Sequence, residues 1–410
     1  DVGANDTALP QVPKPELEIT GSGFHATDDA VSGLVPHRFA VRRVAMSGAA
    51  ETIRINADYQ TTPVVSDPVL EWSVLGSGPE SFTGALPSGD SKRIVWNAVS
   101  GGTIASNLVG FSDGHTVSII SVDGATIQGN EFRDSQSDVV DFYIQSSNIT
   151  FTGNLVTGAA DYGLDAIAGS ATVTNNTFEA NGDGAGQSAG VRFFSAGHTV
   201  QFNEILNNAG PGIIVAGEMV ATPRPRGEAV ISQNEFSGNA GLAVDVQAAS
   251  ESNSLNGDGV TANDGGTTAT SGNLALDFPV ITAADYSGGT TTVVGAACDG
   301  CTIEIYRANA GAGDAGHGEG VLFLGSGTAT GGSFSIAVTG VSPAAEVSAT
   351  ATDTVLAVTS EFAANFVVNG PPTANDDSYS GVSEGGTLNV PATGVLGNDT
   401  DDGLPSGTLS

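Results

Sequence analysis

Three polar side chains occupy equivalent places in successive apolar segments, and their types could support acid–base chemistry. Asp141, Asp165 and Arg192 each stand between two apolar residues, in the strings VDF, LDA and VRF. Alternation along a strand places such a middle residue on the opposite face from its neighbours, so all three should point outward. Two carboxylates beside an arginine could move protons on a sugar, or form a surface ladder in which Arg192 offsets Asp165.

The surroundings of this row do not complete a catalytic constellation. At the next equivalent places the sequence has Ile214 and Ala243, so the polar row is expected to stop there. No lysine lies between residues 94 and 253, and His115 and His198 fall at other positions of the repeat. The sequence therefore favours no catalytic residue, and the alternative site consists of Asp141, Asp165 and Arg192.

Acidic clusters elsewhere in the chain suggest calcium. Calcium takes six to eight oxygen ligands, which closely spaced Asp and Asn side chains on loops can supply. The alternative is that these residues form Asx turns without any ion. The candidate ligands are Asp258, Asn263 and Asp264 in a glycine-rich segment, and Asp376, Asp377, Asp399, Asp401 and Asp402 further on.

The chain has only two cysteines, Cys298 and Cys301, in the string CDGC between two strand-like runs. We predict a small disulfide that clamps a hairpin, with a reduced pair as the alternative. A zinc or redox site built from four cysteines is excluded by the count.

Composition narrows the class of protein. The 410 residues include 57 glycines, and the formal net charge is -33 with 12 lysines and arginines together. A surface this acidic disfavours nucleic acid and anionic lipid as partners. No apolar run approaches the roughly 18 residues of a membrane helix. No signal peptide is visible at Asp1, so we expect either a chain that follows a removed signal or a fragment.

Internal repetition is the strongest pattern. Six segments share the order apolar, two residues, Asn, one residue, apolar, with 22 to 31 residues between successive asparagines. Repeats of this length with short strands indicate a solenoid, and stacked coils would align the asparagines in a ladder at a turn that tolerates left-handed backbone. The predicted ladder is Asn107, Asn130, Asn154, Asn176, Asn203 and Asn234. The pattern resembles the right-handed parallel β-helix family of bacterial and archaeal surface proteins over residues 94–253.

The remaining segments are assigned around this solenoid. Residues 1–93 contain alternating strand-like runs and are expected to form an N-terminal cap or small β domain. Residues 254–276 are an Asp- and Gly-rich linker. The strings GHGEGVLFLGS and VSATATDTVLAVTSEF resemble a bacterial Ig-like β-sandwich over residues 277–369. The strings ANDDSYS and GVLGNDTDDG resemble part of a cadherin-like repeat, or a donated strand segment, over residues 370–410.

The predicted fold class is therefore all-β, a right-handed parallel β-helix followed by Ig-like sandwich modules. The leading functional hypothesis is an extracellular structural or adhesive surface protein, a subunit of a filament or matrix whose solenoid is a rigid body. Its expected partners are sister subunits, other surface proteins and glycans. The alternatives are a secreted polysaccharide-active enzyme (lyase, glycosidase or epimerase) and a glycan-binding module without catalysis.

Overall fold

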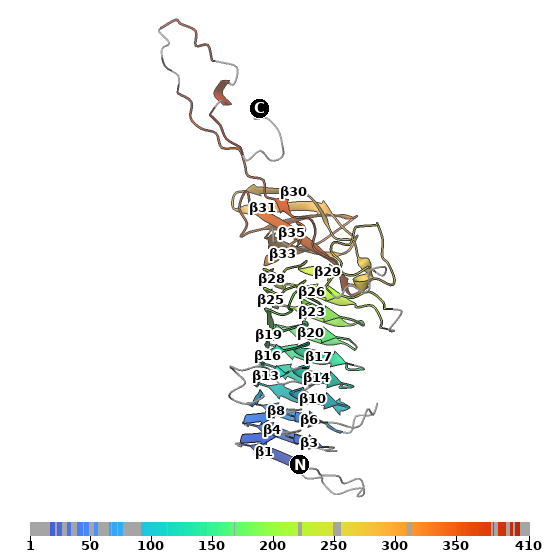
Figure 1. Cartoon of the computed structure of the whole chain (residues 1–410). Coiled ribbons are helices and arrows are strands. Elements are labelled where there is room, and N and C mark those ends of the chain that lie inside the picture. The colour runs from blue at the N-terminus through green and yellow to red at the C-terminus, as the bar shows by residue number, and fades with distance from the viewer. Residues whose placement is uncertain are drawn as a thin grey trace.

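A computed structural model gives the fold, a tall stack of strands with a sheet-rich module at one end (Figure 1). The structure describes residues 92–401 except 113, 144, 168, 220–223, 249–255, 310–313, 379, 381–383, 391–393 and 397. Before residue 92 it describes 17–20, 23–26, 31–33, 39–43, 45–48, 53–55, 65–66, 68–71 and 73–76. The predicted calcium ligand Asp402 lies outside the described residues.

Three parallel sheets run along the stack, and each coil of the chain contributes one strand to each sheet. The first sheet contains β1 (Leu17–Thr20), β4 (Phe39–Arg42), β8 (Val69–Glu71), β12 (Thr103–Ala105), β15 (Thr126–Gln128), β18 (Ile149–Thr152), β21 (Ala171–Thr174), β24 (His198–Gln201) and β27 (Ala229–Ser232). The second contains β2 (Gly23–Ala26), β5 (Ala45–Gly48), β9 (Val74–Gly76), β13 (Leu108–Ser112), β16 (Glu131–Ser135), β19 (Leu155–Ala159), β22 (Thr177–Glu179), β25 (Glu204–Leu206) and β28 (Glu235–Ser237).

The third sheet contains β3 (Val31–Gly33), β6 (Ile53–Ile55), β10 (Ile94–Asn97), β14 (Val117–Ile120), β17 (Val140–Tyr143), β20 (Tyr162–Ala166), β23 (Ala189–Phe193), β26 (Ile213–Val215) and β29 (Val244–Val246). A smaller sheet pairs β7 (Val65–Ser66) with β11 (Val99–Ser100). The all-β class and the right-handed parallel solenoid predicted from the repeat are confirmed.

The N-terminal boundary predicted at residue 94 is wrong. Strands β1 to β6, β8 and β9 belong to the same three parallel sheets as the later coils, so these strands extend the solenoid instead of forming a separate cap. The asparagine pattern does not reach these coils, and for this reason the repeat was not visible there.

The six predicted asparagines stack in one continuous ladder, which we call the first ladder. Each Nδ2 donates to Oδ1 of the next asparagine at 2.8–3.0 Å. The same Oδ1 accepts the backbone amide of the preceding ladder residue at 2.9–3.0 Å. All six side chains are buried. These bonds satisfy polar groups that would otherwise be stranded inside the solenoid.

Two properties of asparagine were expected to matter: its amide can bond the neighbouring coil, which is confirmed, and it tolerates left-handed backbone, which is not the reason here. The residue before each ladder asparagine has the positive φ, between 52° and 64°, and the ladder residue itself does not. These preceding residues are Ser106, Gly129, Gly153, Asn175, Phe202 and Gln233. The ladder position therefore requires the amide side chain for its hydrogen bonds.

A second ladder lies five residues after the first and was not predicted. Asn181 donates from Nδ2 to Oδ1 of Asn208 at 3.0 Å, and Asn208 donates likewise to Asn239 at 2.8 Å. Apolar side chains fill the interior between the ladders and the third sheet, as the repeat predicted. They include a stack of Phe132, Phe151 and Phe178, whose neighbouring ring centroids are 6.2 Å apart.

Two antiparallel sheets follow the solenoid and form a β-sandwich. One contains β30 (Val280–Ser287), β31 (Thr290–Ala296) and β34 (Ser333–Val338). The other contains β32 (Thr302–Ala308), β33 (Gly320–Thr328), β35 (Glu346–Asp353), β36 (Val358–Thr359) and β37 (Phe366–Val367). The finer Ig-like resemblance stays a prediction.

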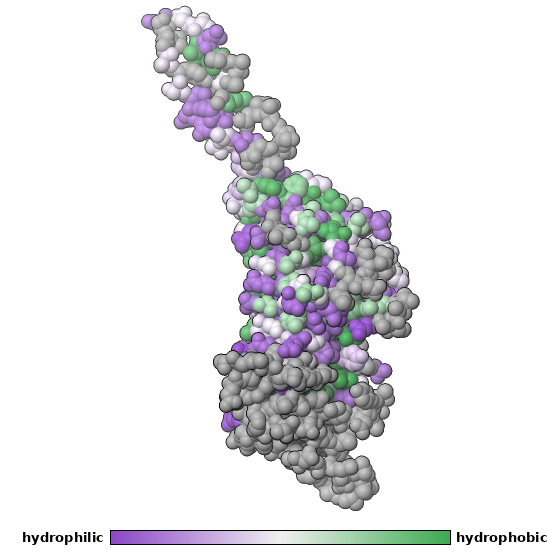
Figure 2. Space-filling view, in the orientation of Figure 1, coloured by the Kyte–Doolittle hydropathy of each residue, from purple (hydrophilic) through white to green (hydrophobic). Residues whose placement is uncertain are grey.

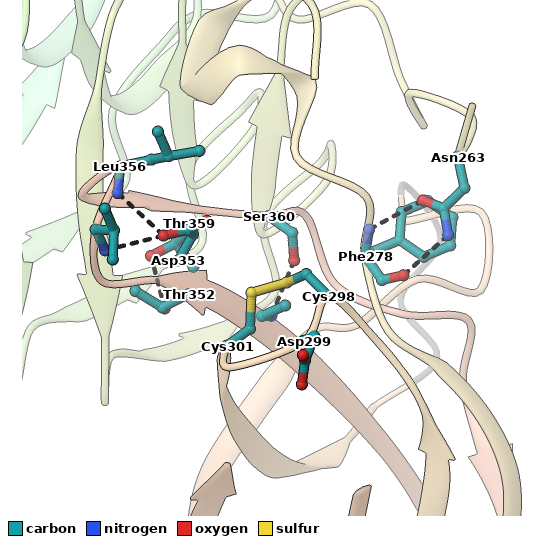
Figure 3. Close-up of a disulfide and its surroundings, with 12 residues drawn as sticks. Asn263, Phe278, Cys298, Asp299, Cys301, Thr352, Asp353, Leu356, Thr359 and Ser360 are labelled. Carbon is teal, nitrogen blue, oxygen red and sulfur yellow. Dashed lines mark hydrogen bonds between the residues drawn. A yellow bond between two sulfur atoms is a disulfide. The ribbon is translucent and has the colours of Figure 1, made fainter. Parts of the chain in front are cut away.

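Cys298 and Cys301 are joined by a disulfide (Figure 3). The hairpin expected around it is wrong, because β31 pairs with β30 and β34, whereas β32 pairs with β33 and β35. The disulfide therefore closes the turn by which the chain passes from one sheet of the sandwich to the other.

The sandwich packs directly on the last coil of the solenoid. Tyr306 and Phe362 belong to the same buried cluster as the solenoid interior, and the rings of Phe236 and Phe362 meet edge to face at 5.8 Å. The segment between the modules, with the 3-10 helix η2 (Gly272–Ala275), also lies against the last coil, since Gly272 donates its amide to Gln247 O at 3.0 Å. On the face shown in Figure 2, the molecular surface continues from the solenoid to the sandwich without a constriction.

The segment after Gly370 projects beyond the sandwich (Figure 1). Its described residues form one isolated bridge, between Thr373 and Thr400, and the 3-10 helix η3 (Gly394–Leu396). The cadherin-like resemblance stays a prediction. In the described part of the chain, no helix has the length and apolar character of a membrane span.

Candidate functional site

Asp141, Asp165 and Arg192 occupy adjacent places on the third sheet, as their spacing predicted. β17 pairs Asp141 with Asp165 of β20, and β20 pairs Asp165 with Arg192 of β23. Their neighbours Val140, Leu164 and Val191 face the interior. The third-sheet row is the name used below for the aligned residues from β14 to β29: Ser118, Asp141, Asp165, Arg192, Ile214 and Asp245.

The predicted end of this row is partly wrong. Ile214 follows Arg192, but the next strand places Asp245 beside Ile214, two residues later than the expected Ala243. Gly241, used to align the last segment, lies in the preceding turn and donates its amide to Gly210 O. The row therefore ends in a carboxylate at the sandwich end of the solenoid.

The expectation of an exposed surface row is also wrong. The side chains lie outside the solenoid interior, yet Asp141 is 5%, Asp165 2% and Arg192 5% exposed. Tyr162 is part of the cover, with its ring centroid 3.9 Å from Arg192 Cζ. Phe194 lies farther out, with its ring centroid 5.1 Å from the same atom, and Arg224 stacks on Phe194.

Arg192 and Asp165 form a bidentate pair inside this cover. Nε donates to Oδ1 at 2.9 Å and Nη2 to Oδ2 at 2.6 Å, while Nη1 donates to the hydroxyl of Tyr162 at 2.8 Å. Burial alone would lower the pKa of Arg192, but the charge of Asp165 and these bonds raise that pKa above its ordinary value. Arg192 thus neutralises the charge of Asp165 as predicted, but the two residues form a buried ion pair instead of a surface one.

Asp141 is the carboxyl of the row with a buried oxygen that makes no hydrogen bond, as is also true of the Ser118 hydroxyl. In Asp141 this oxygen is Oδ1. Burial raises the pKa of Asp141 to about 8, and the charge of Asp165 adds to the shift, while the charges of His115 and Lys92 oppose it. Asp141 therefore keeps its proton near neutral pH, as a carboxyl that could act as a general acid.

His115 and Asp138 lie next to Asp141 and were missed by the sequence argument. His115 Nδ1 is 3.3 Å from Asp138 Oδ2, and Asp138 Oδ1 accepts the backbone amide of Tyr162 at 3.0 Å. Burial opposes protonation of His115, but the neighbouring carboxylate of Asp138 raises its pKa. The statement that no histidine lies near the row is therefore wrong.

Lys92 was left out of the search for catalytic residues only because the solenoid was taken to start at residue 94. The structure places it just before β10, where its charge acts on Asp141.

The arrangement of these side chains combines a protonated carboxyl, an imidazole and a fixed ion pair. A buried carboxyl that keeps its proton near neutral pH, with an imidazole in the same region, has the chemistry needed for general acid–base catalysis.

The predicted calcium ligands lie elsewhere. Asp258 Oδ2 accepts the amide of Ala248 at 3.0 Å, and Asn263 exchanges two hydrogen bonds of 2.9 Å with the backbone of Phe278 (Figure 3). Asp264 Oδ1 accepts the amide of Gly266, and Asp399 Oδ1 accepts that of Asn375.

Asp376, Asp377 and Asp401 are exposed. Within the described residues, no three His, Cys, Asp or Glu side chains gather as a metal-binding group. The calcium interpretation stays a prediction.

Replacing Asp141 with asparagine is expected to stabilise the protein at alkaline but not at acidic pH. The folded protein holds a proton on Asp141 that the unfolded chain releases, so the contribution of Asp141 to the free energy of unfolding falls by about 1.4 kcal/mol per pH unit between about pH 4 and 8. Asp141→Asn removes this slope. Denaturant unfolding of both proteins at about pH 5 and about pH 8 measures this slope. If the difference in free energy of unfolding between wild type and Asp141→Asn were the same at both pH values, the raised pKa of Asp141 would be contradicted.

Comparison with known proteins agrees with the fold. Residues 115–278 match the family model described as the right handed beta helix region, in agreement with the three parallel sheets of the solenoid. No curated protein matches the sequence.

Three solved structures are similar at low identity. The A-module of the mannuronan C-5 epimerase AlgE6 of Azotobacter vinelandii is 16% identical with a TM-score of 0.42, over 51% of this chain and 55% of that module. ORF18 of Geobacillus virus E2 is 12% identical with a TM-score of 0.35, over 90% and 74%. The Dettilon tailspike protein is 13% identical with a TM-score of 0.32, over 70% and 69%. This chain thus spans about half of the epimerase module.

Proposed function

We propose that the protein acts on polysaccharides outside the cell, with the third-sheet row as its site. The observation that carries this proposal is Asp141, a buried carboxyl with a partnerless oxygen and a pKa of about 8, beside His115. Buried, poorly satisfied titratable groups are unfavourable for folding and concentrate at functional sites. The disulfide supports an oxidising location. The similarities to solved structures are too low to carry the argument.

In this proposal Asp141 is the proton donor and the pair of Asp165 and Arg192 is a fixed charge that positions it. His115, whose Nδ1 lies 3.3 Å from Asp138 Oδ2, is in this proposal the group that exchanges the proton of Asp141. The reaction class is acid–base chemistry on a sugar, either cleavage of a glycosidic bond or inversion at a ring carbon.

A screen of acidic and neutral polysaccharides, with binding and turnover measured separately, tests the proposal. Asp141→Asn is expected to bind as well as the wild type and to lose at least about a hundredfold in turnover, because general acid–base catalysis contributes about that much or more. The matched control is Asp123→Asn, which removes an exposed carboxylate bonded to Ser147 and Asn148 outside the row. Equal loss in both variants, or none in Asp141→Asn, would refute the assignment.

A second function, a rigid structural rod of a surface or matrix, is favoured by a different observation. The first ladder runs without interruption from Asn107 to Asn234, and the apolar interior continues into the sandwich. This function predicts a stiff, elongated particle that neither binds nor turns over any polysaccharide of the screen. It is the hypothesis that remains if the screen fails.

A further inference from the structure

The last coil of a solenoid presents three open strand edges. Here these belong to β27, β28 and β29, the final strands of the three sheets. In a parallel sheet, alternate residues of an edge strand direct their amides at the place where the next strand would lie. Such edges recruit other chains unless they are covered.

At the second sheet, Glu319 of the sandwich takes the place of the next ladder asparagine. Along the second ladder, the amide and Nδ2 of Asn181 both donate to Oδ1 of Asn208, and those of Asn208 both donate to Oδ1 of Asn239. The amide and Nδ2 of Asn239 both donate to Oε1 of Glu319, at 2.8 and 2.7 Å. Glu319 Oε2 accepts the amide of Gly238 at 2.6 Å.

At the first sheet, the acceptors come from Glu304 and Thr359. Along the first ladder, the residues before four of the asparagines donate their amides to carbonyls of the next coil, as Gly153 does to Thr174 O. Gln233, which precedes the last asparagine, donates instead to Glu304 Oε2 at 3.0 Å. Within β27, Ile231 donates its amide to Thr359 Oγ1 at 2.9 Å.

At the third sheet, the acceptor for an amide of the last coil is Glu361. Val246 of β29 donates its amide to Glu361 Oε1 at 2.9 Å. The other oxygen, Oε2, accepts the amide of Thr261 at 3.0 Å, so the same carboxyl fastens the segment between the modules. Beside each of the three sheets, a glutamate therefore accepts at least one backbone amide of the last coil.

We infer that the sandwich is the end cap of the solenoid, and that Glu304, Glu319 and Glu361 replace the acceptor atoms of an absent next coil. All three side chains are buried, and a buried carboxyl is tolerated only when its oxygens are hydrogen-bonded. The solenoid and sandwich consequently form one cooperative folding unit. End-to-end stacking of coils at this end requires displacement of the sandwich.

Hydrogen exchange in the full-length chain tests the cap at single amides. In Glu319→Ala, the amides of Gly238 and Asn239 are expected to exchange at least about tenfold faster than in the wild type, because both lose their acceptor. Glu319→Gln keeps one acceptor oxygen, is expected to show a smaller increase, and serves if the alanine variant does not fold. The amide of Asn176, in the middle of the first ladder, is expected to stay protected in both.

The matched control is Asp299→Ala, which removes a carboxylate that accepts the amide of Gly331 at 2.7 Å within the sandwich, in a turn remote from the solenoid. It is expected to leave Gly238 and Asn239 unchanged. Calorimetry of the wild type is expected to give one transition, and alanine at all three glutamates should separate it into two. The inference would be overturned if the amides of Gly238 and Asn239 exchanged at the wild-type rate in both Glu319 variants. Two thermal unfolding transitions in the wild type would also overturn it.

Discussion

Replacing Asn176 with alanine is expected to lower the free energy of unfolding by roughly 3–6 kcal/mol, since each buried group left without its partner costs about 1–3 kcal/mol. The Oδ1 of Asn176 accepts both the amide and Nδ2 of Asn154, and its Nδ2 donates to Asn203 Oδ1 and Phe151 O. Alanine leaves the backbone amide of Asn154 without its acceptor and takes one partner each from Asn154 Nδ2, Asn203 Oδ1 and Phe151 O, all in the interior. Equilibrium unfolding by denaturant measures the loss.

The adjacent Asn175 supplies the control. It is exposed and has a φ of 57°, a conformation that glycine adopts freely, so Asn175→Gly should change stability by no more than about 0.5 kcal/mol. If both variants lost the same stability, the ladder would not be the source of the effect.

Replacing Arg192 with leucine is expected to lower the free energy of unfolding by about 3–5 kcal/mol, because the carboxylate of Asp165 is then buried without its partner. The two side chains share two hydrogen bonds and are almost completely buried. The loss should be smaller at acidic pH, where protonation of Asp165 removes the unpaired charge. Denaturant unfolding of the variant at acidic and neutral pH measures both effects.

The double variant Asp165→Leu with Arg192→Leu separates the ion pair from packing. It is expected to recover most of the stability lost in the single variant, since neither charge remains buried alone. The matched arginine is Arg133, which pairs with Glu131 at 2.6 Å on the solenoid surface, and Arg133→Leu should cost at most about 1 kcal/mol. A double variant as unstable as Arg192→Leu would show that the arginine acts through packing instead of charge.

The ladder could be predicted because its spacing is local and its chemistry is uniform. The position of a strand relative to the ladder asparagine was equally available: eleven residues separate Asn130 from Asp141, and the same interval separates Asn234 from Asp245. Using this interval instead of the glycine at position 241 would have placed the last member of the row correctly. The second ladder was likewise visible as an asparagine five residues after Asn176, Asn203 and Asn234.

The burial of the row could not be predicted from alternation. Alternation decides which side of a strand a residue faces, but cover from Phe194 and Arg224 depends on where the loops between sheets fold. The proximity of His115 to Asp141 has the same origin, because the two residues come from consecutive coils. The glutamates of the cap are separated from the last coil by up to about 115 residues of sequence, and no repeat links them.

The central claim is that the third-sheet row is a polysaccharide site, and a hydrogen-exchange footprint tests it most directly. The full-length protein is compared with and without a saturating amount of each polysaccharide of the screen. The account predicts slower exchange in and around β17, β20 and β23 for at least one of them, with no change in the sandwich. Slower exchange confined to the sandwich or to the other two sheets, or no change with any polysaccharide, would contradict it.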